Sequence, residues 1–256
     1  MPLREEFDRT GQWLFRWRSY LPLLLFLPVV AALHDFTYLG GSQKLDLAWE
    51  AVCLAVAVAG LVVRGATVGF AARGTSGRNT REGQVAATVN TTGLYSLVRH
   101  PLYLGNYLLW LGPSLFPRRW WLPLLVSLAF CVYYERIMFA EEEFLRRTFG
   151  ALFEEWASAT PAFLPFARGW RQRWRRPALP FSLATVLRQE YSGFYGTVAT
   201  FTVLEIVADR AAMGRWIWDP AWAAFFTFGT VVYVALLLAK RRTRTLRARA
   251  LRAHGG

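Results

Sequence analysis

The sequence has little of what builds metal centres or disulfide frameworks. It contains 2 cysteines and 3 histidines in 256 residues. Cys53 and Cys131 both lie inside apolar stretches and lack the spacing of a zinc site or a disulfide framework. We therefore expect two small buried side chains and no metal site. The chain also has no G-x-G-x-x-G fingerprint, which argues mildly against a soluble dinucleotide-binding fold.

Apolar residues are abundant, at 54% of the chain. A membrane-spanning helix needs about 20 predominantly apolar residues. Six stretches are candidates: 19–38, 47–72, 101–117, 119–139, 189–208 and 216–239. Pro22 and Pro28 should bend the first stretch. The first apolar stretch begins too late for a signal peptide, so we expect no cleavage. The sequence predicts an all-α polytopic membrane protein with about six transmembrane helices and a cytoplasmic amphipathic cap after the fourth.

Basic residues outnumber acidic ones, 30 against 17, and the net charge is +13. A charge of this size is compatible with nucleic-acid binding, but its placement argues against it. If all six stretches span, most basic residues fall at the two termini and in the loops after the second and fourth stretches. This asymmetry predicts that both termini are cytoplasmic. We expect the basic blocks 168–176 and 240–252 to bind anionic lipid headgroups, with no nucleic-acid partner.

These patterns divide the chain into five parts. They are an interfacial N-terminal segment (1–18), a membrane core with its cytoplasmic cap (19–165), a basic surface linker (166–188), a C-terminal transmembrane helix pair (189–239) and a basic cytoplasmic tail (240–256). Within the second stretch, Gly65 and Gly69 form a small-xxx-small pair, which lets another helix approach closely.

Two polar features leave alternatives open. Arg64 lies within the second apolar stretch, where it either pairs with a neighbouring helix or contacts an anion in a cavity. The loop 72–93 is rich in Gly, Ser, Thr and Asn. It is either a plain connector or a phosphate site, in which Arg78 and Asn79 would supply donors.

Residues 91–105 place a charged turn at the start of a helix. Pro101 biases His100 toward an extended conformation and itself suits the first turn of the following helix. Tyr95 and Tyr103 flank the Arg99–His100 pair. A second polar cluster lies at the end of the fourth apolar stretch and contains Arg136, Glu141 and Glu142. Together these groups offer carboxylates for an ammonium, aromatic rings for a cation and arginines for an anion, a combination that suits S-adenosylmethionine.

The segments GLYSLVRHPLYLG (93–105) and AEEEFLRRTFGALFEEW (140–156) resemble one family of proteins. This is the integral-membrane methyltransferase family that includes isoprenylcysteine carboxyl methyltransferase and phospholipid N-methyltransferases. The resemblance covers about residues 60–165. It implies S-adenosylmethionine bound between the helices and a cytoplasmic cap, with a membrane lipid as the acceptor. Membrane sterol reductases share a similar RHP-x-Y segment and use a nicotinamide cofactor, but the acidic triplet favours the methyltransferases.

The resemblance also implies roles for individual positions. The cofactor-binding positions are Asn90, Tyr95, His100, Pro101, Leu102, Tyr103, Glu141 and Glu142. Asn90 stands where family members often carry a histidine-containing segment. Arg136 lies one residue from a substrate-side arginine of the family, and Arg99 or Arg78 would help it to orient an anionic acceptor. His100 would act as a base only for an amine or hydroxyl acceptor.

The extended segment 74–106 and the C-terminal helix pair resemble a narrower bacterial branch, the lipid A 1-phosphate methyltransferases of the inner membrane. This resemblance implies that the phosphate of lipid A is the preferred acceptor. Phospholipid N-methylation and isoprenylcysteine-type carboxyl methylation are the alternatives. A nicotinamide-dependent membrane reductase and a non-enzymatic membrane protein are more distant possibilities.

Overall fold

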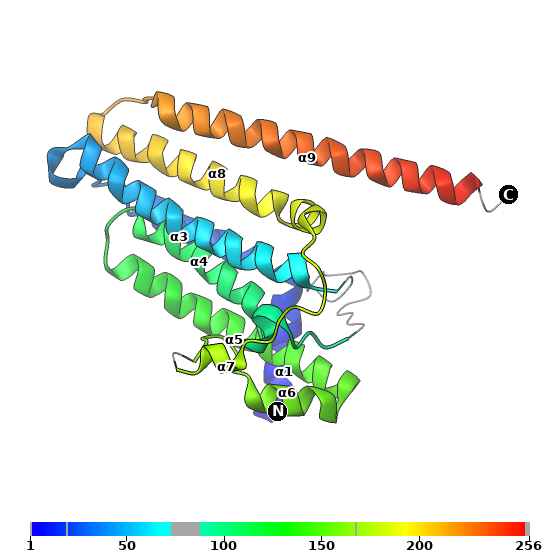
Figure 1. Cartoon of the computed structure of the whole chain (residues 1–256). Coiled ribbons are helices and arrows are strands. Elements are labelled where there is room, and N and C mark those ends of the chain that lie inside the picture. The colour runs from blue at the N-terminus through cyan, green and yellow to red at the C-terminus, as the bar shows by residue number, and fades with distance from the viewer. Residues whose placement is uncertain (1, 19, 73–87, 167, 254–256) are drawn as a thin grey trace.

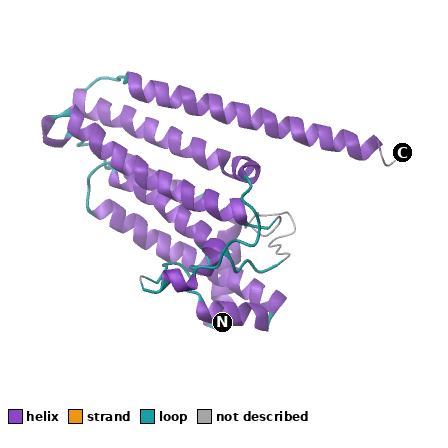
Figure 2. Cartoon of the chain, viewed as in Figure 1, coloured by secondary structure: helices purple, strands orange, loops and turns teal. Residues whose placement is uncertain are grey.

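Every regular element in the described part of the chain is a helix (Figure 2). The computed structural model describes residues 2–18, 20–72, 88–166 and 168–253, with backbone only from residue 243 onward. The elements are α1 (Leu3–Trp17), η1 (Leu21–Leu25), α2 (Phe26–Ala31), η2 (Leu39–Gly41), α3 (Gln43–Phe70), η3 (Gly93–Ser96), α4 (Pro101–Leu115), α5 (Trp121–Phe149), α6 (Ala151–Ala159), α7 (Trp170–Arg173), α8 (Leu183–Met213) and α9 (Pro220–Ala253). The predicted all-α class is confirmed.

The long helices lie side by side in one bundle (Figure 1). α3 packs against both α4 and α8, α5 packs against α4 and α1, and α9 packs against α8. The short connections 32–42, 116–120 and 214–219 lie together at one end of the bundle. The RHP turn meets the end of α5 at the opposite end of the bundle.

Three helices are long and apolar enough to cross a membrane: α3, α5 and the part Pro220–Arg242 of α9. α1 and the stretch Leu21–Ala31 add a fourth if they are counted as one broken span, bent by 77°. The membrane architecture is therefore confirmed, whereas the predicted count of six spans is not. At 15 residues, α4 is shorter than the roughly 20 needed. In α8, threonines, glycines and acidic residues lower the mean hydropathy.

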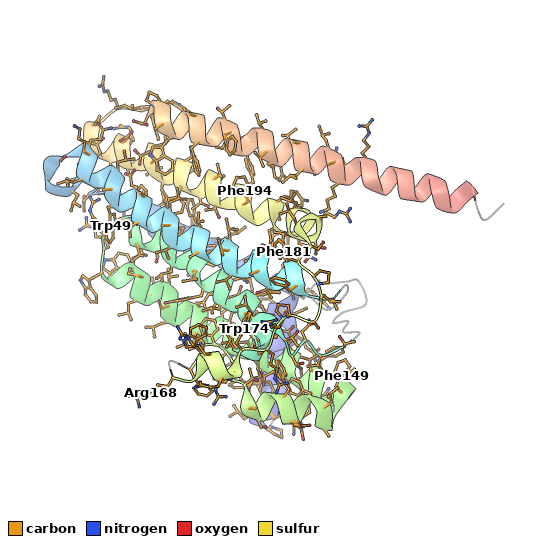
Figure 3. All side chains as sticks on the ribbon, viewed as in Figure 1. Trp49, Phe149, Arg168, Trp174, Phe181 and Phe194 are labelled. Atoms are coloured by element: carbon orange, nitrogen blue, oxygen red, sulfur yellow. The ribbon has the colours of Figure 1, made fainter. Side chains whose placement is uncertain are left out.

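Glycines bring α3 close to both of its neighbours. A Cβ atom added to Gly60 would lie 2.6 Å from the carbonyl oxygen of Gly105 in α4. A Cβ atom on Gly69 would overlap the ring of Phe181, which lies just before α8 and is labelled in Figure 3. Gly65 also faces α8. α4 therefore packs on α3 at backbone distance, whereas the side chains of Phe181 and Val186 fill the space over Gly65 and Gly69.

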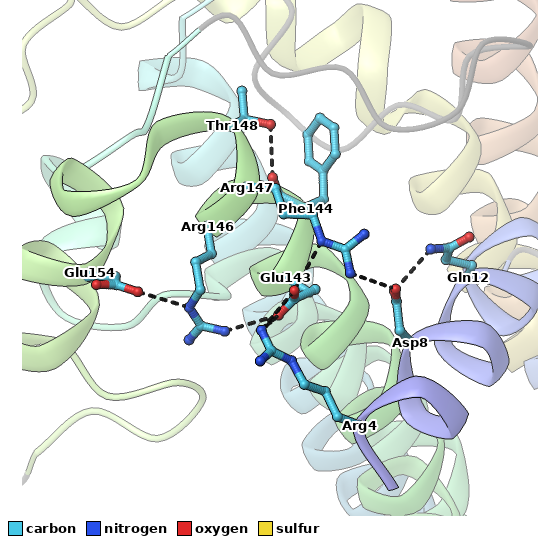
Figure 4. A network of polar contacts seen from close by, with 9 residues as sticks. All are labelled: Arg4, Asp8, Gln12, Glu143, Phe144, Arg146, Arg147, Thr148 and Glu154. Atoms are coloured by element: carbon cyan, nitrogen blue, oxygen red, sulfur yellow. Dashed lines mark hydrogen bonds and ion pairs between the residues drawn. The ribbon is translucent and has the colours of Figure 1, made fainter. Parts of the chain in front are cut away.

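A network of ion pairs holds α1 on the end of α5 (Figure 4). Both carboxylate oxygens of Glu143 accept hydrogen bonds from Arg4, at 2.8 and 2.9 Å. Arg147 donates to Glu143 at 3.0 Å and to Asp8 at 3.2 Å. Deeper in this contact, Gly11 packs directly on the backbone of α5. Glu143 thus faces α1, away from the cavity described below.

A second buried ion pair lies at the other end of the bundle. Arg118 donates to the carboxylate of Asp46, and its guanidinium lies 4.6 Å from the ring centroid of Phe36. Nearby, Tyr38 donates to Asp209 at 2.7 Å. These contacts join the start of α3 to the turn after α4 and to the end of α8.

Candidate active site

A cavity of about 530 Å³ opens where the RHP turn meets the ends of α3, α5 and α8. This volume lies within the range of roughly 300–1,000 Å³ that is typical of small-molecule sites. Its walls come from α1, η1, α3, η3, α4, α5, α6 and α8. The site is therefore assembled by the tertiary fold, although two local segments supply most of its charge.

The local sequence sets the shape of the RHP turn. Gly93 has φ +62° and begins the short helix η3. His100 is non-helical, with φ −122° and ψ 60°, and Pro101 begins α4. The backbone amides of Arg99 and His100 donate to carbonyl oxygens of residues 161 and 162 at 2.8 and 3.0 Å. This pairing ties the turn to the segment that follows α6.

Glu142 joins the two polar segments in one site. Its Oε1 accepts hydrogen bonds from Arg99 Nε and from His100 Nε2, each at 2.8 Å. The other ring nitrogen of His100 lies 3.5 Å from Glu141 Oε2. Arg99 also donates to the carbonyl oxygen of Ala157, at 2.7 Å. All four charged side chains are mostly buried, so each charge is balanced by a neighbour of opposite sign.

His100 is held in its charged form. Burial by itself lowers the pKa of an imidazole. Here the hydrogen bonds and charges of Glu141 and Glu142 outweigh burial, and the pKa of His100 is raised above its usual 6.5. A carboxylate beside each ring nitrogen suits an imidazolium, in which both nitrogens are donors.

Aromatic rings form one wall of the cavity. The ring of Tyr103 stacks on His100 with centroids 5.5 Å apart, and Tyr134 lies 4.9 Å from Tyr103. On the other side, Trp156 Nε1 donates to the backbone carbonyl of Tyr95 at 3.2 Å. Burial raises the pKa of Tyr95, and the charge of Glu141 raises it further. These tyrosines therefore present neutral rings.

The structure brings most of the predicted site residues together. The cavity is lined by Asn90, Tyr95, Arg99, His100, Pro101, Leu102, Tyr103, Glu141 and Glu142. Arg136 is placed elsewhere: its guanidinium lies 4.3 Å from the ring centroid of Phe7, and it donates to Thr10 at 3.2 Å. Arg136 is thus part of the contact between α1 and α5. Arg78 and Asn79 lie outside the described residues.

Of the other lining residues, the sequence singled out only Arg64, for which pairing with a neighbouring helix and contact with an anion in a cavity were both left open. Arg64 donates from Nε and Nη2 to both oxygens of Glu190, at 2.6 and 2.9 Å, and from Nη1 to Asn106. Arg18 also lines the cavity. Asn106 directly follows the RHP-x-Y-x-G segment, and this position was the one feature of the sequence that could have marked it as a site residue. Glu190 lies on α8, far away in sequence, and nothing local indicates its role.

Together, the fold and the cavity define an integral membrane protein with a charged, aromatic-lined small-molecule site at one end of its helix bundle. Comparison with known families identifies the class further. Residues 52–151 match the sequence model of the phospholipid methyltransferase family. The match covers less than half of the chain, and this part resembles that family, as the RHP and EEE segments predict. The narrower lipid A branch is not confirmed by the match.

Two curated relatives are detectably similar. The chain is 33% identical over 140 residues to the nickel-cobalt-cadmium resistance protein NccN of Alcaligenes xylosoxydans xylosoxydans, over 54% of this chain and 62% of that protein. It is 40% identical over 78 residues to the cobalt-zinc-cadmium resistance protein CzcN of Cupriavidus metallidurans, over 30% of this chain and 36% of that protein. The chain thus spans less than two thirds of either relative. No solved structure matches it. In the described part of the chain, no group of three or more His, Cys, Asp or Glu side chains is arranged to hold a metal ion.

Proposed function

We propose that this protein is an S-adenosylmethionine-dependent methyltransferase that modifies a membrane lipid. The observation that carries the proposal is the shared cavity of the Arg99–His100 turn and the Glu141–Glu142 pair. A buried site with this many charges is costly at the end of membrane helices unless those charges are used. The family match at residues 52–151 supports the reaction class.

The residues present fit the cofactor. Glu141 and Glu142 are carboxylates that suit an ammonium group, and the faces of Tyr95 and Tyr103 suit a sulfonium cation. When bound, S-adenosylmethionine supplies an electrophilic methyl group. In this role Glu142 also orients His100 and Arg99, so one carboxylate holds the shape of the cofactor end of the cavity.

The charge of the cavity favours an anionic acceptor. Its described charged side chains are Arg18, Arg64, Arg99, His100, Glu141, Glu142 and Glu190. Three arginines balance three glutamates, and protonated His100 leaves one positive charge. S-adenosylmethionine adds another, because its sulfonium and ammonium outweigh its carboxylate. An acceptor that carries negative charge neutralises this excess at low solvent exposure.

A lipid phosphate, preferably that of lipid A, meets this requirement. A phosphate monoester has a second pKa of about 6 and is mostly dianionic at pH 7. One of its oxygens forms a bond to the methyl carbon while the carbon–sulfur bond breaks. Sulfur keeps the electron pair and becomes a neutral thioether, and the phosphate becomes a methyl diester with one negative charge fewer. No proton is transferred, so positioning and electrostatics carry the step.

The state of His100 also favours this acceptor over an amine. An amine acceptor must lose a proton, and His100 would be the base in reach of the cavity. The two carboxylates raise the pKa of His100 and so disfavour the neutral imidazole that would accept that proton. Phospholipid N-methylation is the second candidate, supported by the family match rather than by the charge of the site.

We also propose that the cavity faces the cytoplasm of a bacterium, with both termini on that side of the inner membrane. The support is the distribution of basic residues, which concentrate on the connections and tail at the cavity end. S-adenosylmethionine is a cytosolic metabolite, so this orientation would give the cofactor access to the site.

Binding measurements test the proposal most directly. The purified protein in lipid nanodiscs is titrated with S-adenosylmethionine and with NADPH by calorimetry. We expect saturable binding of S-adenosylmethionine only, and binding of NADPH alone would favour a reductase. Mass spectrometry of lipids from cells with and without the protein then identifies the acceptor. A gain of one methyl group on lipid A is the expected result, and a gain on aminophospholipids would favour the second candidate.

A further inference from the structure

A second polar cluster lies in the same cavity, away from the Arg99–His100 turn. Its centre is Arg64 on α3, one of the helices that can span a membrane. The Arg64 side chain is 22% exposed, and its ion-pair partner Glu190 is 8% exposed. Both residues line the cavity, as does Asn106, which accepts a hydrogen bond from Arg64 Nη1. A charged pair at this depth is unusual and marks a candidate ligand contact.

The helices are shaped to admit this arginine. A Cβ atom on Gly105 of α4 would lie 2.5 Å from Arg64 Cγ and 2.8 Å from the carbonyl oxygen of Gly60. Only glycine at position 105 therefore leaves room for the arginine stem between α3 and α4. Gly105 closes the RHP-x-Y-x-G segment, so the family segment itself positions Arg64.

The contacts of Arg64 leave hydrogen-bonding capacity for a ligand. A guanidinium has five N–H donors. Three of them are used by the two oxygens of Glu190 and by Asn106. The bidentate pairing fixes the plane of the guanidinium. Guanidinium groups fixed in this way recognise phosphate oxygens well.

A continuous set of contacts joins Arg64 to the cofactor end of the cavity. Asn106 Nδ2 donates to Tyr134 Oη at 3.0 Å. The ring of Tyr134 lies 4.9 Å from that of Tyr103, which stacks on His100. Tyr103 and Tyr134 therefore separate two charged ends of one cavity, as a transfer between two bound ligands requires.

We propose that Arg64, fixed by Glu190 and Asn106, binds the anionic phosphate oxygen of the acceptor lipid. This inference rests on the proposed methyltransferase function and names the acceptor contact of the same site. It has a structural consequence, because Glu190 belongs to α8 and lies outside residues 52–151, the part that matches the family. The C-terminal helix pair thus takes part in acceptor recognition as well as in packing. Methylation removes one negative charge from the phosphate, so the contact with Arg64 weakens in the product and favours its release.

The bundle contains a matched control for this arginine. Arg118 pairs with Asp46 at the opposite end, with side-chain exposures of 20% and 1%. Neither Arg118 nor Asp46 is among the described residues that line the cavity. Arg64→Lys and Arg118→Lys therefore disturb comparable buried ion pairs, but only the first changes the proposed acceptor contact.

The test measures binding of each ligand separately, in nanodiscs. The probes are S-adenosylmethionine and phosphatidic acid, a lipid phosphate monoester, with diacylglycerol as the uncharged comparison. For Arg64→Lys we expect phosphatidic acid affinity to fall about tenfold, the loss of one charge-assisted hydrogen bond. S-adenosylmethionine affinity should stay within about threefold of the wild type. Arg118→Lys should leave both affinities unchanged, and diacylglycerol should bind weakly to all variants.

Glu190→Gln gives a result that packing alone would not produce. Removing the carboxylate relieves repulsion of the phosphate, so phosphatidic acid should bind more tightly. Methyl transfer should slow at saturating acceptor, because the guanidinium is less well oriented. If Arg64→Lys does not fold, the double variant Arg64→Gln/Glu190→Gln removes both buried charges and should show the same loss of phosphatidic acid affinity.

Equal phosphatidic acid affinity in wild type and Arg64→Lys would overturn the inference. Loss of S-adenosylmethionine binding in Arg64→Lys would overturn it as well, since the arginine would then serve the cofactor. Failure of the proposed function has a different signature, namely a wild-type protein that binds no S-adenosylmethionine.

Discussion

Replacing Glu142 by glutamine tests whether the RHP turn and the acidic end of α5 form one binding site. Glu142 Oε1 accepts from Arg99 and from His100, each at 2.8 Å. The amide keeps the size of the side chain and removes its charge. A hydrogen bond to a charged group contributes about 1.5–3 kcal/mol. We count roughly one such bond as lost, because the amide oxygen still accepts one donor.

Because the same carboxylate is proposed to hold the ammonium group of the cofactor, the loss of its charge should weaken cofactor binding by a similar free energy. Each 1.4 kcal/mol corresponds to about a factor of ten, so S-adenosylmethionine should bind about 10- to 100-fold more weakly to Glu142→Gln. Calorimetric titration of the protein in nanodiscs measures this directly. The variant should remain folded, because Arg99 retains its hydrogen bonds to the backbone carbonyls of Ala157 in α6 and of Thr160 just after it.

The neighbouring glutamate supplies the control. Glu143 lies on the same helix end, but its carboxylate pairs with Arg4 and Arg147 and faces α1. Glu143→Gln should keep the wild-type affinity for S-adenosylmethionine. Because the arginine partners Arg4, Arg146 and Arg147 are largely solvated, we expect this variant to remain folded. Equal affinities in the two variants would refute the assignment of Glu142 to the cofactor site.

Three further predictions follow from the packing and from the charge on His100. Gly11→Ala should lower the thermal unfolding midpoint, because the added Cβ overlaps a carbonyl oxygen of α5. Gly196→Ala is the control: its Cβ would have no atom within 4 Å, so higher helix propensity should raise the midpoint. The reverse order would contradict the tight α1–α5 contact. The raised pKa of His100 stabilises the fold fully below about pH 6.5. This contribution should be lost as pH rises through the folded-state pKa. The thermal unfolding midpoint of the wild type should therefore decrease as pH rises above 6.5, and that of His100→Gln should decrease less steeply. Parallel slopes would count against a charged His100. Gly105→Ala should displace Arg64 and weaken phosphatidic acid binding more than S-adenosylmethionine binding, which paired titrations would detect; a larger loss for the cofactor would argue against that contact.

Local chemistry made part of the site predictable. Pro101 keeps His100 out of the helix and marks the start of α4, and the structure has both. The acidic triplet ends a long apolar helix, so its carboxylates had to lie near the polar end of the bundle. Two local segments with complementary charge at the same end predict a contact, and Glu142 makes it with His100. The roles of these residues in binding remain predictions until the titrations are done.

Helix phase explains why Arg136 was harder to place. It lies six residues before Glu142 on α5, so the two side chains point about 120° apart around the helix. Glu142 faces the cavity, and Arg136 consequently faces α1, where it contacts Phe7 and Thr10. The docking of α1 on this face is a tertiary contact that the sequence pattern of α5 does not reveal. The role of Arg136 in acceptor binding therefore has no geometric support.

The predicted count of six spanning helices is not confirmed, because length and composition identify three or four among the described residues. α4 is short and α8 is only partly apolar, and both pack against α3. In a bundle, a helix with such neighbours needs less apolar surface than one surrounded by lipid. Hydropathy measures composition and does not distinguish these environments.

The two buried arginine–carboxylate pairs differ in what they connect. A buried ion pair is weak support for stability, because desolvation offsets most of the attraction between the charges. Arg118 and Asp46 join connections at the end that holds the short turns, where the pair fixes the ends of helices. Arg64 and Glu190 join no connections; they link the last two turns of α3 to the early part of α8 at the cavity wall. Helix ends give the first pair a structural reason to exist, whereas the second pair lacks one unless the cavity holds a charged ligand. This difference favours an acceptor contact on α3 and α8 rather than on the cytoplasmic cap.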